Sequence, residues 1–148
     1  MSNLNTTEVK HVSDIVQVLN SGIEFYTDAK SKVDSPNIAR FFDRMIAARK
    51  SVKQQLQPFA VVEEGKPEQG SAFTVDARKV YTKVISAISS DKDHTYISHL
   101  EEVEDKTLEE IRAALDEKQP ADCESALLAA LSTMKACHDE MRNLKRAA

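Results

Sequence analysis

The stretch that decides the fold is residues 12–45, VSDIVQVLNSGIEFYTDAKSKVDSPNIARFFDRM. Its first half carries apolar side chains three and four residues apart, which is the spacing of one face of an α-helix. Ser35 and Pro36 then mark a new start, because serine caps a first turn and proline there has no N–H to lose. Two long helices joined by so few residues must pack as an antiparallel hairpin. The apolar positions of the first helix are Val12, Ile15, Val16, Leu19, Ile23 and Tyr26.

The rest of the chain repeats this hairpin after one longer interruption. Residues 63–71, EEGKPEQGS, contain two glycines and a proline and are typical of a loop. Pro120 marks a second, tighter connection at residues 118–122. Between these breaks the apolar spacing predicts helices. Their ranges are 6–32, 36–62, 74–89, 94–117 and from the second connection to residue 145.

This order of elements predicts a particular topology. Two antiparallel helical hairpins are joined by a long crossover over residues 63–93, which contains its own short helix. Four-helix bundles with one long crossover have the ferritin-like topology, whereas an up-and-down bundle needs a short second loop. We therefore predict an all-α fold, with a single ferritin-like helical-bundle domain over residues 1–148.

The composition agrees with one globular helical domain. The 148 residues are 41% hydrophobic and 30% charged, which is ordinary for a globular protein. A chain of this length buries enough surface to fold without disulfides or metal ions. Only three Gly and four Pro interrupt a sequence rich in good helix formers, so the composition favours helices throughout.

The charge pattern and the chain ends limit the partners and the location. The net charge is −4 and the basic residues are scattered, so no nucleic-acid footprint is visible. Residues 1–11 lack the apolar core of a secretory signal, and no apolar run approaches the roughly 20 residues of a membrane span. We expect a cytoplasmic protein that binds neither nucleic acid nor membrane. A basic group at the C-terminus, Arg142, Lys145 and Arg146, is expected to complement the dipole of the last helix.

The two cysteines are expected to be small buried side chains of one helix. Cys123 and Cys137 stand fourteen residues apart near its apolar face. At a rise of about 1.5 Å per residue their Cα atoms would be ~21 Å apart, whereas a disulfide needs less than about 7 Å. The sequence therefore predicts no disulfide within the chain.

Short motifs lie in a fixed order along nearly the whole chain: Leu19-x-x-Gly22-x-x-x-Tyr26, Asp34-x-Pro36, Ala47-Ala48-Arg49, Gly65-x-Pro67-Glu68-x-x-Ser71, Glu101-x-x-Glu104-Asp105 and His138-Asp139. Each motif is short, and their order and spacing carry the information. Together they resemble an uncharacterised bacterial ferritin-like family, a domain of unknown function. The resemblance implies a ferritin-like bundle. It implies no activity, because that family has none established.

The expected bundle can be tested for a di-metal centre. Such a centre needs a glutamate from each of two helices and Glu-x-x-His from each of the other two. The third long helix offers Glu101 and Glu104, and the last offers His138, but Lys135 stands where the glutamate before this histidine is required. The inward mid-helix position of the first helix is Ile23. We therefore expect no di-metal site and no cofactor, with Glu101, Glu104 and His138 as an incomplete ligand set.

The remaining histidines do not suggest a site. Glu8 and His11 have metal-ligand spacing, but they have no partner motif, so a solvated helix face is expected. His94 and His99 are five residues apart, point in different directions and are expected at the surface. The sequence contains no glycine-rich phosphate loop, nucleophile elbow or Cys-x-x-Cys pair. We therefore expect that the protein is not an enzyme.

Three ionisable residues fall on the apolar faces of the expected helices. Arg49 lies near the centre of one face, His138 near the centre of another, and Glu104 at the edge of a third. Ionisable side chains are rarely buried without a partner. One interpretation is a buried polar cluster in which Arg49 pairs with Glu104 and His138 lies close by. The alternative is that Arg49 extends along the helix surface and places its charge in solvent.

Two functions from different classes are compatible with these features. The first is a non-enzymatic ferritin-like protein that has lost its di-metal site and has an interaction or stress-related role, as a possible homo-oligomer. The second is a metal-handling or redox protein in which Glu101, Glu104 and His138 form a partial site that a second subunit completes. The metal content of the purified protein distinguishes the two.

Overall fold

The computed structural model describes residues 7–70 and 92–147. Within these ranges the chain forms four α-helices and no β-strand. The helices are α1 (Val12–Lys30), α2 (Pro36–Glu64), α4 (Lys92–Asp116) and α5 (Ala121–Ala147). The all-α prediction is thus confirmed for the described residues, and each observed helix overlaps a predicted one. The short helix predicted over residues 74–89 lies outside them.

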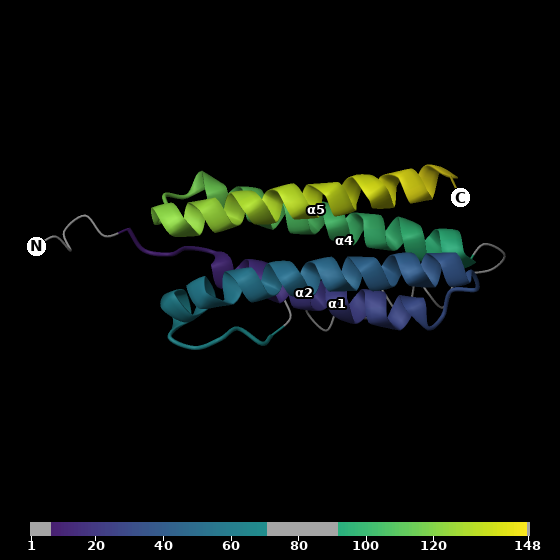
Figure 1. Cartoon of the computed structure of the whole chain (residues 1–148), viewed down its shortest axis with the longest axis horizontal. Coiled ribbons are helices and arrows are strands. Elements are labelled where there is room, and N and C mark those ends of the chain that lie inside the picture. Colours follow the sequence, from purple (N-terminus) through teal and green to yellow (C-terminus); the bar gives the residue numbers. More distant parts are fainter. Residues whose placement is uncertain (1–6, 71–91, 148) are drawn as a thin grey trace, which may run out of the picture.

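The four helices pack side by side as a bundle of two hairpins (Figure 1). The first hairpin is α1 with α2, and the second is α4 with α5. Between the hairpins, α1 packs on α4 and α2 packs on α5. Each helix therefore has two neighbours, and α2 faces α4 only across the bundle interior. A side chain that joins α2 to α4 must cross the centre of the molecule.

Carboxylates of other helices bind the backbone at two of the helix starts. Glu63, near the end of α2, accepts hydrogen bonds from the backbone N–H groups of Val12 and Ser13, each at 2.9 Å. Asp93, near the start of α4, accepts from the N–H groups of Asp34 (2.8 Å) and Ser35 (3.0 Å). The first N–H groups of α1 have no partner within the helix, so the Glu63 carboxylate there is favourable, whereas α2 is capped by the Ser35 side chain, which accepts from the N–H of Ile38.

These contacts also fix the direction of each helix. Through Glu63, α2 ends beside the start of α1. Through Asp93, α4 begins beside the start of α2. The end of α2 and the start of α4 therefore lie at opposite ends of the bundle, and α2 and α4 run in the same direction.

Residues 65–70 turn back after α2 and are tied to the first hairpin. The side chain of Gln57 makes two hydrogen bonds to the backbone of Glu68, at 2.8 and 3.1 Å. The Glu68 carboxylate accepts from Gln17 on α1 at 3.1 Å, and the Gly70 carbonyl accepts from Asn20 at 3.0 Å. The predicted loop thus begins at Gly65, because α2 extends two residues further than expected.

The start of α1 differs from the prediction. The expected helix begins at residue 6, whereas α1 begins at Val12. His11 has φ 64°, a left-handed conformation that a helix cannot contain. Glu8 and His11 therefore do not share a helix face, and that interpretation was wrong. The His11 ring lies between the carboxylates of Asp14 (3.3 Å) and Glu117 (3.4 Å), which raise its pKa.

The apolar faces meet in one continuous core. Val12, Ile15, Val16, Leu19 and Tyr26 are buried as predicted, but Ile23 is only partly buried. Its inward place is taken by Gly22 and Phe25. Cys123 and Cys137 are both buried free thiols, as expected.

His99 was predicted at the surface but is half-buried. Its ring packs edge-to-face on Phe25 of α1, with 5.9 Å between the ring centres, and burial lowers the pKa of His99. None of the described helices is long and apolar enough to cross a membrane.

Candidate functional site

The centre of the bundle contains an ion pair. Arg49 on α2 and Glu104 on α4 both have fully buried side chains. The Arg49 guanidinium donates to Oε2 of Glu104 from Nη2 at 2.9 Å and from Nε at 3.3 Å. Because α2 and α4 face each other only across the interior, this pair crosses the middle of the bundle. The geometry corresponds to the buried pair and not to the solvent-extended arginine.

Two further side chains complete what we call the central cluster: Arg49, Glu104, Tyr26 and Thr107. The Tyr26 hydroxyl donates to Oε2 of Glu104 at 2.6 Å. Arg49 Nη2 also donates to the Thr107 hydroxyl at 2.8 Å. The Tyr26 ring lies 5.6 Å from the guanidinium carbon, within the range of a cation–π contact. The buried charges are therefore paired and hydrogen-bonded, which a buried ion pair requires.

A glycine makes room for the guanidinium. A Cβ atom on Gly22 of α1 would lie 2.1 Å from Nη1 of Arg49, far closer than two such atoms can approach. The Arg49 side chain thus fits because position 22 has no side chain. Glycine inside a helix costs about 1 kcal/mol relative to alanine, so a mid-helix glycine was a signal that this position is crowded.

Burial governs the ionisation of the groups around the pair. The pKa of Tyr26 is raised well above its usual value by burial and by the negative charge of Glu104. Tyr26 is therefore a neutral hydroxyl donor. The pKa of the Cys137 thiol is raised to about 11, again by burial first and Glu104 second. Tyr26 and Cys137, next to the pair, are therefore neutral at physiological pH.

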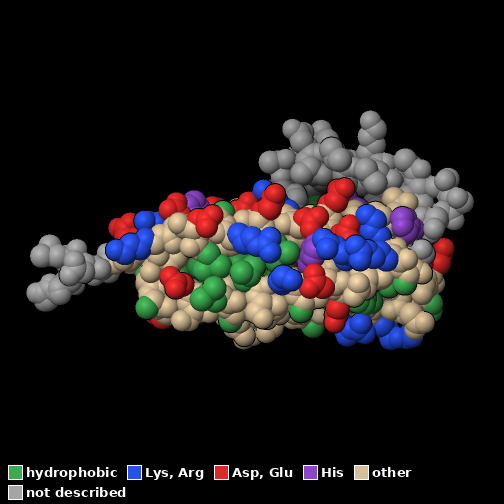
Figure 2. Space-filling view, turned by 90° about the horizontal axis from the view of Figure 1, so that it is seen from above, with side chains coloured by type: hydrophobic (Ala, Val, Ile, Leu, Met, Phe, Trp, Pro, Cys, Tyr) green, Lys and Arg blue, Asp and Glu red, His purple; other side chains and the backbone are tan. Residues whose placement is uncertain are grey.

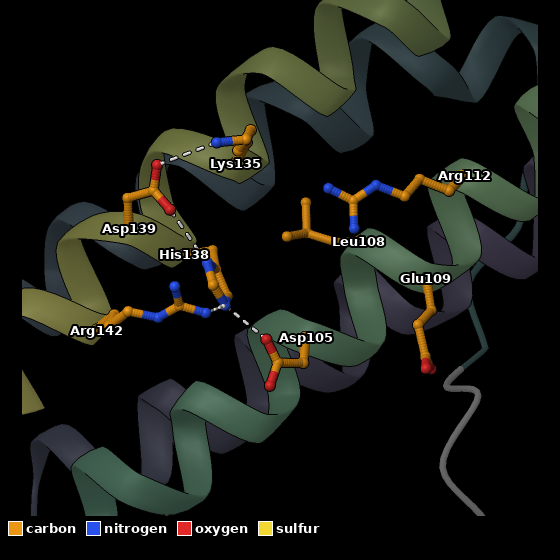
Figure 3. Close-up of a pocket in the computed structure, with 8 residues that line it drawn as sticks. All are labelled: Asp105, Leu108, Glu109, Arg112, Lys135, His138, Asp139 and Arg142. Atoms are coloured by element: carbon orange, nitrogen blue, oxygen red, sulfur yellow. Dashed lines mark hydrogen bonds and ion pairs between the residues drawn. The ribbon is translucent and has the colours of Figure 1, made fainter.

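His138 was expected beside this pair, but its contacts are elsewhere. It lies on α5, almost buried, and its Nε2 is 2.5 Å from Oδ1 of Asp105 on α4. Its Nδ1 is 3.3 Å from Oδ1 of Asp139, and Nη2 of Arg142 lies 3.4 Å from its Nε2. His138 therefore joins α4 to α5 on the side of the bundle (Figure 3). The predicted cluster is thus divided into a central pair and a lateral histidine.

The three candidate metal ligands are not brought together. Glu101 pairs with Lys145 of α5 at 3.1 Å, Glu104 with Arg49, and His138 with Asp105. Within residues 7–70 and 92–147 no group of three or more His, Cys, Asp or Glu side chains could hold a metal ion. Oε1 of Glu104 is the one oxygen of the central cluster with no hydrogen-bond partner among the described residues. A single carboxylate oxygen next to a guanidinium does not fit a di-metal centre.

A groove of about 450 Å³ lies between α4 and α5, over the His138–Asp105 contact. We call it the α4–α5 groove. Figures 2 and 3 show this face of the molecule, with charged side chains of both signs around the groove. The residues that line it are Asp105, Leu108, Glu109, Arg112, Lys135, His138, Asp139 and Arg142. Sequence reasoning missed Asp105, Arg112 and Lys135 as neighbours, since they come together only when the register of α4 against α5 is known.

Comparison with known proteins identifies the domain without adding an activity. The model of one protein family, described as a domain of unknown function (DUF2383), matches residues 7–117. No curated protein matches the chain. The matched residues cover α1, α2 and α4 and include the whole central cluster. Because the match spans well over half of the sequence, the chain belongs to the family of this domain of unknown function, DUF2383.

Proposed function

We propose that this protein is a ferritin-like, non-enzymatic interaction protein in which an ion pair has replaced the di-metal centre. The observation that carries the proposal is the fully buried Arg49 guanidinium at the bundle centre. In a ferritin-like bundle the metal ions are held at this level by inward carboxylates and histidines of all four helices. Here Arg49 of α2 binds the inward carboxylate of α4.

The ferritin-like topology is part of the proposal, and the helix directions support it. In that topology a long crossover runs the length of the bundle from the second helix to the third. The end of α2 lies beside the start of α1, and the start of α4 lies beside the start of α2. A chain that joins those two points has to run from one end of the bundle to the other. A short up-and-down connection cannot do this.

The chemistry of the central cluster argues against metal binding there. Arginine remains protonated at every physiological pH, so its guanidinium is a permanent positive charge. A divalent cation placed beside Glu104 would be repelled by that charge in a medium of low dielectric constant. It would also have to break the bonds to Arg49 and Tyr26. The cluster therefore acts structurally, and we infer that the function lies on the surface.

The proposed role is binding, in an interaction or stress-related process, with a homo-oligomer as one possible assembly. We also propose a bacterial, cytoplasmic setting. The alternative, a metal-handling or redox protein completed by a second subunit, requires Glu101, Glu104 and His138 to face one ion. Each of them is instead bound to a different basic or acidic partner.

Elemental analysis tests the proposal. Protein purified without chelators should contain far less than one equivalent of iron, manganese, copper or zinc per chain. Incubation with excess Fe²⁺ or Mn²⁺ followed by desalting should not change this. The variants Glu104→Gln and His138→Asn should give the same values as the wild type and as Glu102→Gln, a control at an exposed position of α4. Stoichiometric metal that is lost in the first two variants and kept in the control would establish the alternative.

A further inference from the structure

We propose that the α4–α5 groove binds an elongated small molecule that carries an anionic group at each end. The inference rests on the two arginines of the groove, Arg112 and Arg142, and is independent of the function proposed for the bundle centre. Its starting point is the register of α4 against α5. The contact between Asp105 Oδ1 and His138 Nε2, at 2.5 Å, shows which residues of the two helices lie opposite each other.

The arginines stand on either side of that contact. Arg112 is seven residues beyond Asp105 along α4, or about 10 Å at 1.5 Å per residue. Arg142 is four residues beyond His138 along α5, or about 6 Å. Because α4 and α5 are antiparallel, these steps lead in opposite directions along the groove. The two arginines therefore flank the groove at its two ends.

Both side chains lean toward the middle of the groove. Side chains of an α-helix incline toward its N-terminus, which here brings each guanidinium back toward the Asp105–His138 level. Figure 3 shows this directly, with the Arg112 guanidinium beside Leu108 and the Arg142 guanidinium beside His138. The distance of 3.4 Å between Arg142 Nη2 and His138 Nε2 confirms that the Arg142 guanidinium lies next to the histidine ring.

Neither guanidinium is neutralised by a carboxylate of the described chain. Nε2 of His138 lies 2.5 Å from Oδ1 of Asp105, and a nitrogen that donates to this carboxylate cannot also accept from Arg142. Among the ion pairs of the described residues, none includes Arg112 or Arg142. Two cations that point into one groove without an anion form a binding site for anionic groups.

The carboxylates of the groove do not cancel this preference. Asp105 is bound to His138, and Asp139 is bound to both His138 and Lys135 (3.4 Å). The pKa of Asp139 is lowered by these contacts, His138 first, so it stays ionised and engaged. Glu109 also lines the groove, and its carboxylate lies 4.0 Å from Lys106. The charges left without a partner are thus the two guanidiniums.

The shape of the groove selects the kind of anion. Because the two arginines come from opposite ends of the groove, a molecule with two separated anionic groups engages both of them better than one compact phosphate or carboxylate does. Leu108, which is only 5% exposed, is the one apolar side chain that lines the groove between them. A volume of about 450 Å³ accommodates a small organic molecule. The chemistry therefore indicates a diacid, with a carboxylate or phosphate at either end and a hydrocarbon link.

Titration calorimetry with a series of probes tests this. We expect the linear dicarboxylates from succinate to pimelate to bind with an optimum at one chain length. 4-Phosphonobutyrate, compared with the dicarboxylate of matching length, shows whether a carboxylate or a phosphate-like group is preferred at one end. Inorganic phosphate and butyrate should each bind at least about tenfold more weakly than the best diacid, because each can engage only one arginine.

Variants connect the binding to the two arginines. Arg112→Ala and Arg142→Ala should each weaken the best diacid about tenfold or more and abolish the length preference. Arg112→Lys and Arg142→Lys keep the positive charge but lose the planar guanidinium that can donate two parallel hydrogen bonds. Their affinity for the best diacid should lie between those of the wild type and the alanine variants. Arg40→Ala, which removes an exposed arginine of α2, is the matched control and should bind like wild type. In NMR spectra, diacid should shift the Nε–Hε signals of Arg112 and Arg142.

Three results would each overturn the proposal. The first is the absence of binding by every diacid at millimolar concentration to protein shown to be folded. The second is equal affinity for phosphate, butyrate and the best diacid. The third is binding that survives in Arg112→Ala and Arg142→Ala as well as in Arg40→Ala.

Discussion

Arg49 is the largest fully buried side chain among the described residues. Its guanidinium is fully removed from solvent, and it donates hydrogen bonds to acceptors on α1 and α4. Glu104 supplies the opposite charge, Thr107 and the Val18 carbonyl accept two further N–H groups, and Tyr26 covers one face. Such a pair is costly to break because the partner that remains is a buried, unpaired charge.

Because Arg49 lies so close to Gly22, we predict that a glycine-to-alanine substitution at this position destabilises the protein, although such a substitution inside a helix usually stabilises it. Replacing glycine by alanine inside a helix normally stabilises a protein by about 0.5–1 kcal/mol. At position 22 the new methyl group would overlap the guanidinium, so Gly22→Ala should lower the free energy of unfolding by about 1–3 kcal/mol. Urea denaturation monitored by circular dichroism measures the change.

The control is the same Gly22→Ala substitution in a variant that lacks the ion pair. In Arg49→Ala/Glu104→Leu the guanidinium is gone, and Gly22→Ala should become neutral or stabilising. If Gly22→Ala stabilises the wild type as well, then Arg49 does not occupy the space next to α1, and the central cluster is wrongly placed.

The buried thiols should be unreactive. Burial raises the pKa of Cys123 and of Cys137 to about 11, so at pH 8 only about one molecule in a thousand carries a thiolate at either site. We expect native protein to react with a thiol reagent such as DTNB far more slowly than a small-molecule thiol does, and both thiols to react at once in denaturant. Fast labelling of one cysteine in the folded protein would show that its part of α5 is exposed.

Sequence reasoning reached some of these residues and missed others for physical reasons. Arg49 and Glu104 could be identified because a charged residue on an apolar helix face is conspicuous. Tyr26 and Thr107 also lie on apolar faces, but there they were indistinguishable from ordinary core residues. The predicted helix face of His138 was right, but the sequence could not show whether its ring meets Glu104 or the neighbouring Asp105, which depends on the side-chain direction across the α4–α5 contact.

At the scale of the helices, capping explains where the elements begin. Residues 6–11 contain no glycine or proline, so no local signal separated them from the first predicted helix. The actual start is fixed by Glu63, a residue fifty positions away, which binds the N–H groups of Val12 and Ser13. No local pattern reveals a cap supplied by another helix. The C-terminal boundaries were predicted within two residues, because Gly65 and Pro120 are local signals.

The cap of α1 can be tested with two adjacent glutamates. Glu63→Ala removes the acceptor of three backbone N–H groups and should lower the free energy of unfolding by about 1–2 kcal/mol. Glu64→Ala removes an exposed neighbouring carboxylate and should change it by less than about 0.5 kcal/mol. Hydrogen exchange should also accelerate at Val12 and Ser13 in the first variant only. Equal effects of the two substitutions would show that Glu63 does not cap α1.

For the whole molecule, the short connections were easier to predict than the long one. Two hairpins follow from two tight turns, and the bundle follows from four amphipathic helices. The way in which the hairpins dock depends on which faces meet. That was settled by contacts between distant residues, such as Asp93 with Ser35 and Arg49 with Glu104. These contacts have no signature within any single segment.

The segment that follows α2 should be cut by proteases in a controlled way. Residues 65–70 are mostly exposed, so a glutamate-specific protease should cleave after Glu68 before it cuts inside any of the four described helices. Because Gln57 holds the Glu68 backbone, Gln57→Ala should accelerate that cleavage while leaving the unfolding midpoint nearly unchanged. Early cleavage within residues 12–60 would show that the first hairpin is misassigned.

The central claim is that Arg49 and Glu104 form a buried ion pair across the middle of the bundle, and a double-mutant cycle in urea tests it most directly. We predict that Arg49→Met and Glu104→Leu each lower the free energy of unfolding by about 3–5 kcal/mol, since each leaves one buried charge unpaired. The double variant should cost much less than the sum, because both charges are gone and only neutral groups, the Tyr26 and Thr107 hydroxyls and the Val18 carbonyl, lose a partner. Single variants within about 0.5 kcal/mol of wild type, with simply additive effects, would contradict the account, since an exposed pair contributes only about 0–1 kcal/mol.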